Sequence, residues 1–139
     1  MAKSEGSVSI NAPIEKVFDA IADPEVIAQK SAAKLIATKG TNGEVGSYAD
    51  WKYLKFQSRT TVTEVDKPDK LIQEMTGGMP GKWIWNLSQE GQPVRVDFCI
   101  EYKVPGGVLG KFADKLFLNR INKKNGEKTL QGIKVYCEK

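Results

Sequence analysis

Hydrophobic and polar residues alternate along the middle of the chain. From Lys34 the apolar positions recur every second residue for about seventy residues, as is typical of half-buried β-strands. In the clearest strand, Val94 to Val104, apolar side chains take one face and polar side chains the other. Turn signals divide this stretch at Gly40–Gly46, Lys67–Asp69, Gly77–Gly81 and Glu90–Gln92. Because the connections are short, the pattern predicts a run of six antiparallel strands with one face in water.

The N-terminal part predicts one strand followed by two short helices. Ser7 to Ile10 alternates like a strand, and Pro13 then suits the first turn of a helix. Apolar residues follow at helical spacing: Ile14, Val17, Phe18 and Ile21. Asp23 before Pro24 repeats the start signal and predicts a second helix through about Gln29.

The stretch from Pro105 to Lys139 predicts one long helix whose middle is polar on the face where its ends are apolar. Two rows recur every seven residues: Leu109, Leu116, Lys123, Leu130 and Cys137, with Phe112, Asn119, Gly126 and Ile133 beside them. A helix that only sealed a core would keep this face apolar throughout. The polar centre therefore predicts that the helix faces a space rather than packed neighbours.

The element order predicts an α+β fold within a single domain, residues 1–139. An antiparallel sheet with one apolar face must be covered, and the long C-terminal helix is the only predicted element large enough to cover it. A chain of 139 residues suits one domain with a sizeable core.

Composition narrows the function classes. The chain has no histidine, which removes the commonest general base and metal ligand. Its two cysteines, Cys99 and Cys137, lack the spacing of a disulfide framework or a zinc site. A net charge of +4, spread along the chain, does not indicate a nucleic-acid binder. We expect no metal, no cofactor and no nucleic-acid partner. Since no signal peptide or run of eighteen apolar residues is present, we expect a cytoplasmic protein.

Several segments resemble the START-like (SRPBCC, polyketide cyclase/dehydrase) superfamily. They are the opening Ser7–Pro24, the strand-turn-strand Thr61–Leu71, and Gly106–Phe117 with Lys128–Lys134 near the end. The resemblance implies a helix-grip fold, in which a curved antiparallel sheet wraps around the long C-terminal helix and leaves a cavity for an apolar or amphipathic ligand. It implies no particular reaction. The chain departs from the pattern at Asn125-Gly126, a helix-breaking pair that leaves the continuity of the long helix open.

The candidate cavity wall is aromatic. The residues are Trp51, Tyr53, Trp83, Trp85, Phe98 and Tyr102, on strands expected to surround the long helix. Ordinary core packing is the alternative for each of them. Met79, in the glycine-rich connection, is a candidate gate at the cavity mouth, with a plain hairpin as its alternative.

The candidate polar contacts lie near the middle of the long helix. Lys123 with Asn119 could orient a carboxylate, carbonyl or phosphate head group, beside Leu116 on the same stripe. Alternatively, Lys123 extends its stem along the core and reaches water.

These observations favour binding or transport of a small hydrophobic or amphipathic molecule, such as a lipid, a quinone or a polyketide-like compound. One alternative is a cyclase or dehydratase that uses Tyr53, Arg59 or Tyr102 in the same cavity, although no catalytic residue can be assigned. Another is a module that contacts a protein or, transiently, a membrane surface. Its apolar face would be Val108, Leu109, Phe112, Leu116 and Phe117, beside Lys111 and Lys115. The sequence does not determine an oligomeric state.

Overall fold

Seven antiparallel strands and three helices form the part of the chain that the structure describes, in the order expected from the sequence. The computed structural model describes residues 2–53, 56–78, 80–89, 91, 93–103 and 111–139, and of these the side chains of residues 2 and 111–119 lie outside the description. The elements are β1 (Ala2–Ile10), α1 (Ile14–Ala22), α2 (Pro24–Lys30), β2 (Lys34–Lys39), β3 (Tyr48–Tyr53), β4 (Phe56–Asp66), β5 (Lys70–Gly77), β6 (Gly81–Gln89), β7 (Val94–Tyr102) and α3 (Lys111–Glu138). The α+β class is confirmed.

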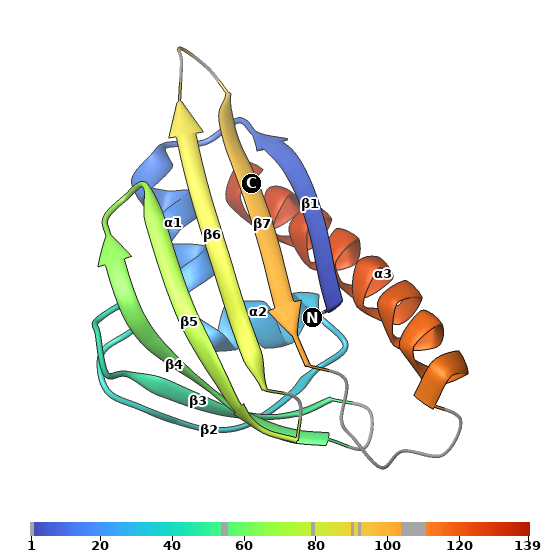
Figure 1. Ribbon diagram of the computed structural model, residues 1–139. Helices are drawn as coiled ribbons and strands as arrows, with labels where there is room; N and C mark the ends of the chain where they lie inside the picture. The colour runs from blue at the N-terminus through green and yellow to red at the C-terminus, as the bar shows by residue number, and fades with distance from the viewer. Residues whose placement is uncertain (1, 54–55, 79, 90, 92, 104–110) are drawn as a thin grey trace.

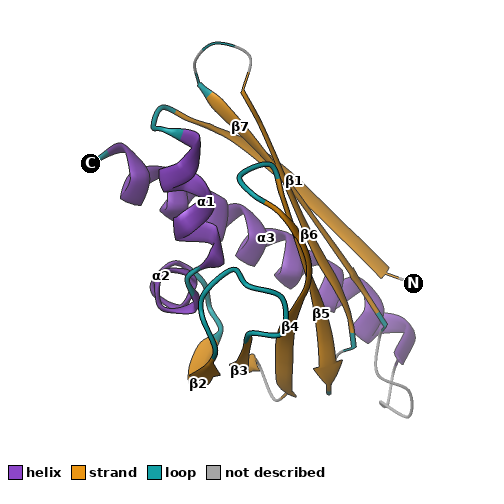
Figure 2. Ribbon diagram, turned by 90° about the vertical axis from the view of Figure 1, so that its left-hand side faces the viewer, coloured by secondary structure: helices purple, strands orange, loops and turns teal. Residues whose placement is uncertain are grey.

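The sheet is a meander closed at one side by the first strand. Its strand order is β1-β7-β6-β5-β4-β3-β2, so β1 pairs with the last strand and each later strand pairs with its neighbour in sequence. The sheet curves strongly, since β2 and β3 cross the lower part of Figure 1 while β5, β6 and β7 run nearly upright. All three helices lie on one face of the sheet (Figure 2).

Alternation along β7 separates the helix-facing side from the outer side. Val94, Val96, Phe98, Ile100 and Tyr102 are buried, and the residues between them are at least partly exposed. This confirms the two-residue period predicted for the strand. The same register carries into β6, where Trp85 lies directly opposite Phe98.

The two short helices begin where the sequence signals predicted. The carbonyl of Pro13 accepts the first bond of α1, from the amide of Val17 at 3.1 Å. The Asp23 side chain caps α2 by accepting from the Glu25 amide at 2.9 Å. Both helices turn apolar side chains toward the sheet, including Val17 and Phe18 of α1.

The long helix is continuous through Asn125-Gly126. Glycine costs about 1 kcal/mol against alanine in a helix interior, too little to break a helix that is packed on both sides of it. The Asn125 side chain holds the helix to the α2–β2 connection by accepting from the Ala32 amide at 2.7 Å. The predicted start at Pro105 falls outside the described residues, and the described helix begins at Lys111.

Among its described residues, the buried side of α3 lacks one member of the predicted rows, Lys123, and includes two residues outside them, Asn122 and Thr129. Its described members are Asn122, Gly126, Thr129, Leu130, Ile133 and Cys137. Lys123, which the seven-residue row placed on this side, is exposed. A straight helix drifts by about 20° per seven residues, so counting back from Leu130 rotates Lys123 away from the sheet. Asn122, four residues before Gly126, takes the buried position instead.

Contacts of α3 leave room beneath the middle of the sheet. The helix packs mainly along β1 and against α1 and α2. Its C-terminal end is fastened by Glu138, which accepts from the Asn11 amide at 2.8 Å and from Lys134 at 2.6 Å. A sheet that curves around a helix held at one edge leaves space between them.

Candidate functional site

A cavity lies between the concave face of the sheet and the three helices. The space open to the centre of a water molecule measures about 100 Å³. Five of the six predicted aromatic residues line it: Trp51, Tyr53, Trp83, Trp85 and Phe98. They come from β3, β6 and β7, and α3 contributes Asn122, Asn125 and Gly126 on the opposite side.

Three of the aromatic rings form one continuous wall. The ring centres of Trp83 and Trp85 are 5.7 Å apart, and that of Phe98 lies 5.8 Å from Trp83 and 5.5 Å from Trp85. These distances are within the range that aromatic pairs prefer, and the ring planes are tilted by 31° to 41°. We call Trp83, Trp85 and Phe98 the aromatic wall.

Gly126 allows the aromatic wall to approach α3. A side-chain carbon at this position would overlap the tip of the Phe98 ring, with Cζ at 2.4 Å and Cε1 at 2.8 Å. The ring also lies against β1, where a carbon added at Gly6 would stand 3.1 Å from Cε1. The Phe98 ring therefore occupies a slot that two glycines create.

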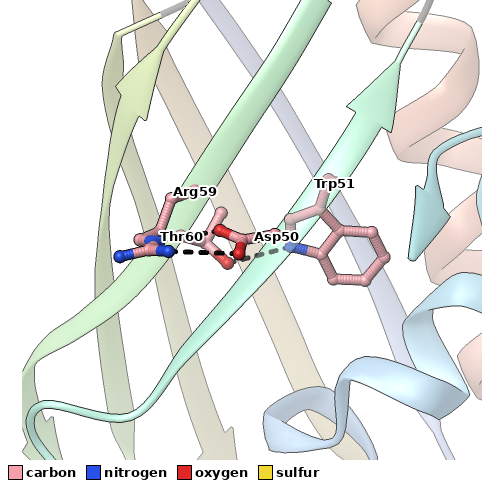
Figure 3. A network of polar contacts seen from close by, with 4 residues as sticks. All are labelled: Asp50, Trp51, Arg59 and Thr60. Atoms are coloured by element: carbon pink, nitrogen blue, oxygen red, sulfur yellow. Dashed lines mark hydrogen bonds and ion pairs between the residues drawn. The ribbon is translucent and has the colours of Figure 1, made fainter. Parts of the chain in front are cut away.

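Every tryptophan indole N–H is already bonded within the sheet. Trp51 donates to the Thr60 hydroxyl at 3.0 Å across the β3–β4 pair, as Figure 3 shows. Trp83 donates to the sulfur of Met75, and Trp85 donates to the side-chain oxygen of Gln73 at 3.4 Å. Two strands thus hold each ring by its polar edge, and the rings offer their apolar surfaces to the cavity.

Arg59, the candidate for polarising a carbonyl, is on the outer face of the sheet. It is exposed and does not appear among the described lining residues. Its guanidinium donates to Asp50 at 2.7 and 3.1 Å (Figure 3) and lies 3.8 Å from the centre of the Tyr48 ring. The Arg59 bond lowers the pKa of Asp50. Because neighbouring residues on β4 face opposite sides of the sheet, Thr60 faces the cavity and Arg59 faces the outer side.

The cavity has a polar region formed by Tyr53 and Asn122. The Tyr53 hydroxyl and the Asn122 amide nitrogen are buried without a hydrogen-bond partner in the part of the chain that the structure describes. Burial, with a smaller effect from Tyr102, raises the pKa of Tyr53 to about 12. Burial also raises the pKa of Tyr102, and the neighbouring Asn122 side chain opposes this rise.

Other predicted site residues take different places. Tyr102 is fully buried in the core beside Asn122 and does not appear among the described lining residues, so the structure favours its core alternative. Lys123 also does not line the cavity, because its side of α3 faces water. Met79 lies outside the described residues, as do the side chains of Leu116 and Asn119.

Sequence reasoning missed Asn122. A signal was present in the sequence, because Asn122, Gly126, Leu130 and Ile133 follow one another at helical spacing of three or four residues. The seven-residue row did not include Asn122. It also missed Asn125, whose position next to a glycine indicated a helix break rather than a bond to another element.

Charge and metal-binding groups are sparse at the site. The described lining residues carry no charged side chain. In the described part of the chain, no three His, Cys, Asp or Glu residues gather as metal ligands. Both cysteines are free thiols, and among the described helices none is long and apolar enough to span a membrane.

Solved structures similar to this one share its fold. The Aha1 dimer from Colwellia psychrerythraea gives a TM-score of 0.69 at 16% identity, over 99% of this chain and 97% of that one. A structural genomics target from Chromobacterium violaceum gives 0.72 at 12% identity, over 100% and 99%. The di-domain ARO/CYC StfQ of the steffimycin biosynthetic pathway gives 0.77 at 10% identity, over 98% of this chain and 50% of that one. Identities this low show the fold alone.

The family assignment comes from the sequence profile. No curated protein matches the chain. The profile of the family described as "Polyketide cyclase / dehydrase and lipid transport" matches residues 1–138. Membership carries with it a ligand-binding cavity, and the cavity described above occupies the corresponding space between sheet and helices. The chain therefore belongs to the polyketide cyclase/dehydrase and lipid transport family of START-like (SRPBCC) proteins.

Proposed function

We propose that the protein binds a compact, ring-bearing apolar molecule and encloses it between the sheet and α3. The observation that carries this proposal is the cavity lining: an aromatic wall, further aromatic rings from β3 and β4, and no charged side chain among the described residues. Aromatic side chains of this kind supply large apolar area at a fixed geometry.

The size of the cavity favours a small ligand. Adding a water radius of about 1.4 Å around a compact region of this size gives an envelope of roughly 300 Å³, the lower end of the range for small-molecule pockets. That room suits about two fused rings better than a long lipid chain. Burial stabilises such a complex by about 0.8 kcal/mol for each CH₂ group removed from water.

Binding of tetralin, a fused-ring hydrocarbon, tests the proposal. Tetralin is titrated into the protein while tryptophan fluorescence and backbone amide shifts are recorded. We expect saturable quenching, because Trp83 and Trp85 belong to the wall, and amide shifts confined to residues around the cavity.

A pair of variants on β4 provides the control. Ser58 lines the cavity and Gln57 faces the outer side of the same strand, so Ser58→Leu places a leucine inside the cavity and Gln57→Leu places one outside it. Ser58→Leu should weaken tetralin binding by about tenfold or more, and Gln57→Leu should leave it unchanged. Equal binding by both variants would show that the probe binds elsewhere and would refute the proposal.

The described lining does not favour the cyclase alternative. A cyclase of the kind named for the ARO/CYC neighbour needs groups that move protons, and among the described lining residues Tyr53 alone is titratable, with its pKa raised to about 12 by burial. Binding alone is therefore proposed. The apolar face considered for a protein or membrane contact lies on residues 108–117, whose side chains are outside the description.

A further inference from the structure

Two residues that line the cavity carry buried donors without a described hydrogen-bond partner. Among the described residues, three buried side-chain atoms lack a hydrogen-bond partner: Ser4 Oγ, Tyr53 Oη and Asn122 Nδ2. Tyr53 and Asn122 line the cavity. The Asn122 residue is only 6% exposed, so water outside the molecule does not satisfy its amide. A buried polar group costs free energy until it is hydrogen-bonded.

The two donors lie in the same region of the cavity. Tyr53 and Tyr102 are the last residues of β3 and β7. These two strands run in the same direction in the antiparallel sheet, so both residues lie at the same end of the strands. The pKa of Tyr53 responds to Tyr102, and the pKa of Tyr102 responds to the Asn122 side chain, so these three side chains are neighbours. Both donors therefore line the same end of the cavity.

Several other polar groups of the lining are hydrogen-bonded to neighbouring parts of the chain. The three indole N–H groups bond to Thr60, Met75 and Gln73, and the Asn125 oxygen accepts from the Ala32 amide. No described lining residue carries a charge that could balance an ionised ligand.

We propose that Asn122 and Tyr53 form a subsite for the carbonyl oxygen of an uncharged ring-bearing ligand, a ketone or quinone, and that the cavity rejects carboxylates and phosphates. This inference rests on the proposed function and adds the chemical class of the ligand. Asn122 Nδ2 and the Tyr53 hydroxyl both donate, and a carbonyl oxygen has two lone pairs to accept them. Because the pKa of Tyr53 is raised to about 12, its hydroxyl keeps its proton throughout the neutral range.

The subsite replaces the one expected from the sequence. Lys123 was a candidate for holding an anionic head group, but it is exposed and does not line the cavity. An ionised ligand would lose its hydration and find no opposite charge among the described lining residues. A neutral acceptor loses much less on entering and satisfies donors that otherwise lack a protein partner.

Three probes of one ring skeleton test the subsite: tetralin, the ketone α-tetralone, and tetralin carboxylate. Affinities are measured by calorimetry at neutral pH for the protein and for Asn122→Leu, Tyr53→Phe and the double variant. Tyr48→Phe is the matched control, since Tyr48 is on the same strand but contacts Arg59 on the outer face. Tetralin binding in each variant reports whether the cavity is intact.

We expect the protein to bind α-tetralone about tenfold more tightly than tetralin, the factor for about two neutral hydrogen bonds, and to bind the carboxylate more weakly than either. Each single variant should reduce the ketone preference about threefold, and the double variant should abolish it. Tyr48→Phe should preserve it.

Failure of the subsite and failure of the proposed function give different results. Equal affinity for α-tetralone and tetralin, or a ketone preference that survives the double variant, would overturn the subsite while leaving binding intact. Tighter binding of the carboxylate would overturn the rejection of anions. No binding of any probe would overturn the proposed function itself.

Discussion

Gly126→Ala should destabilise the protein, although alanine is the better helix former. The new carbon would stand 2.4 Å from Phe98 Cζ, about 1 Å closer than ordinary van der Waals contact. Phe98 cannot withdraw freely, because Trp83, Trp85 and β1 surround its ring. Overpacking of this kind costs about 1–3 kcal/mol, and the gain in helix propensity of about 1 kcal/mol offsets part of it. We expect a net loss of about 1 kcal/mol.

The same substitution should change sign once the ring is shortened. In a Phe98→Leu background the slot is wider, so Gly126→Ala should recover its helix propensity and stabilise that background by about 1 kcal/mol. Urea unfolding followed by tryptophan fluorescence measures all four proteins, and the coupling energy should be about 2 kcal/mol. Stabilisation of the unmodified protein by Gly126→Ala, or a coupling near zero, would refute the reasoning that the glycine exists to admit the ring.

Three further predictions concern bonds and titrations around the site. Thr60→Val keeps the shape of the side chain but leaves the Trp51 indole N–H without its acceptor; it should cost about 1–2 kcal/mol in urea unfolding, whereas Thr61→Val, which removes a hydroxyl from the next position of β4, should cost clearly less. The pKa of Tyr53 is raised from 10.0 to about 12, so its protonated hydroxyl contributes fully to the free energy of unfolding below pH 10, and this contribution is lost as pH rises through 12. After allowance for screening, the free energy of unfolding should fall by about 1 kcal/mol over this range. Tyr53→Phe should not show this fall. The pKa of Glu138 is lowered by Lys134 and the Asn11 amide, so the ionised carboxylate stabilises the fold above its ordinary pKa of 4.5, and this stabilisation is lost as pH falls through the lowered value. The thermal unfolding temperature should therefore depend less on pH between about pH 5 and pH 3 in Glu138→Gln than in the unmodified protein. The same pH dependence in both proteins would contradict this.

The sheet was predictable because its signals are local. Alternation has a period of two, and each turn cluster fell between two observed strands, as at Lys67–Asp69 between β4 and β5. The boundary between β3 and β4 carried no such signal in the sequence analysis. Helix starts were equally local, since Pro13 and Asp23 act within one turn of themselves.

Which side of α3 is buried was harder to predict, because it depends on tertiary contacts. A seven-residue row and a true helical row differ by only about 20° per repeat, yet this difference exchanges Lys123 for Asn122 on the buried side. Lys123 was a candidate ligand contact because of its place in the seven-residue row. The actual choice depends on where β1 and α2 hold the helix, and Asn125 makes one of those bonds with residue Ala32, 93 positions away.

In the proposed function, the aromatic wall and the unpartnered donors contribute differently to ligand binding. The indole N–H groups of the three tryptophans are bonded to neighbouring strands, so the sheet presents a rigid wall whose polar edges are already satisfied. The buried hydroxyl of Tyr53 and the buried amide nitrogen of Asn122, in contrast, have no partner among the described residues. A wall without free hydrogen-bonding groups can contact many apolar shapes. An unpartnered donor, in contrast, favours ligands that have a hydrogen-bond acceptor over ligands that have none. Ligand preference in this chain should therefore change most with substitutions at Asn122 and Tyr53, and affinity for rings in general should change most with substitutions in the aromatic wall.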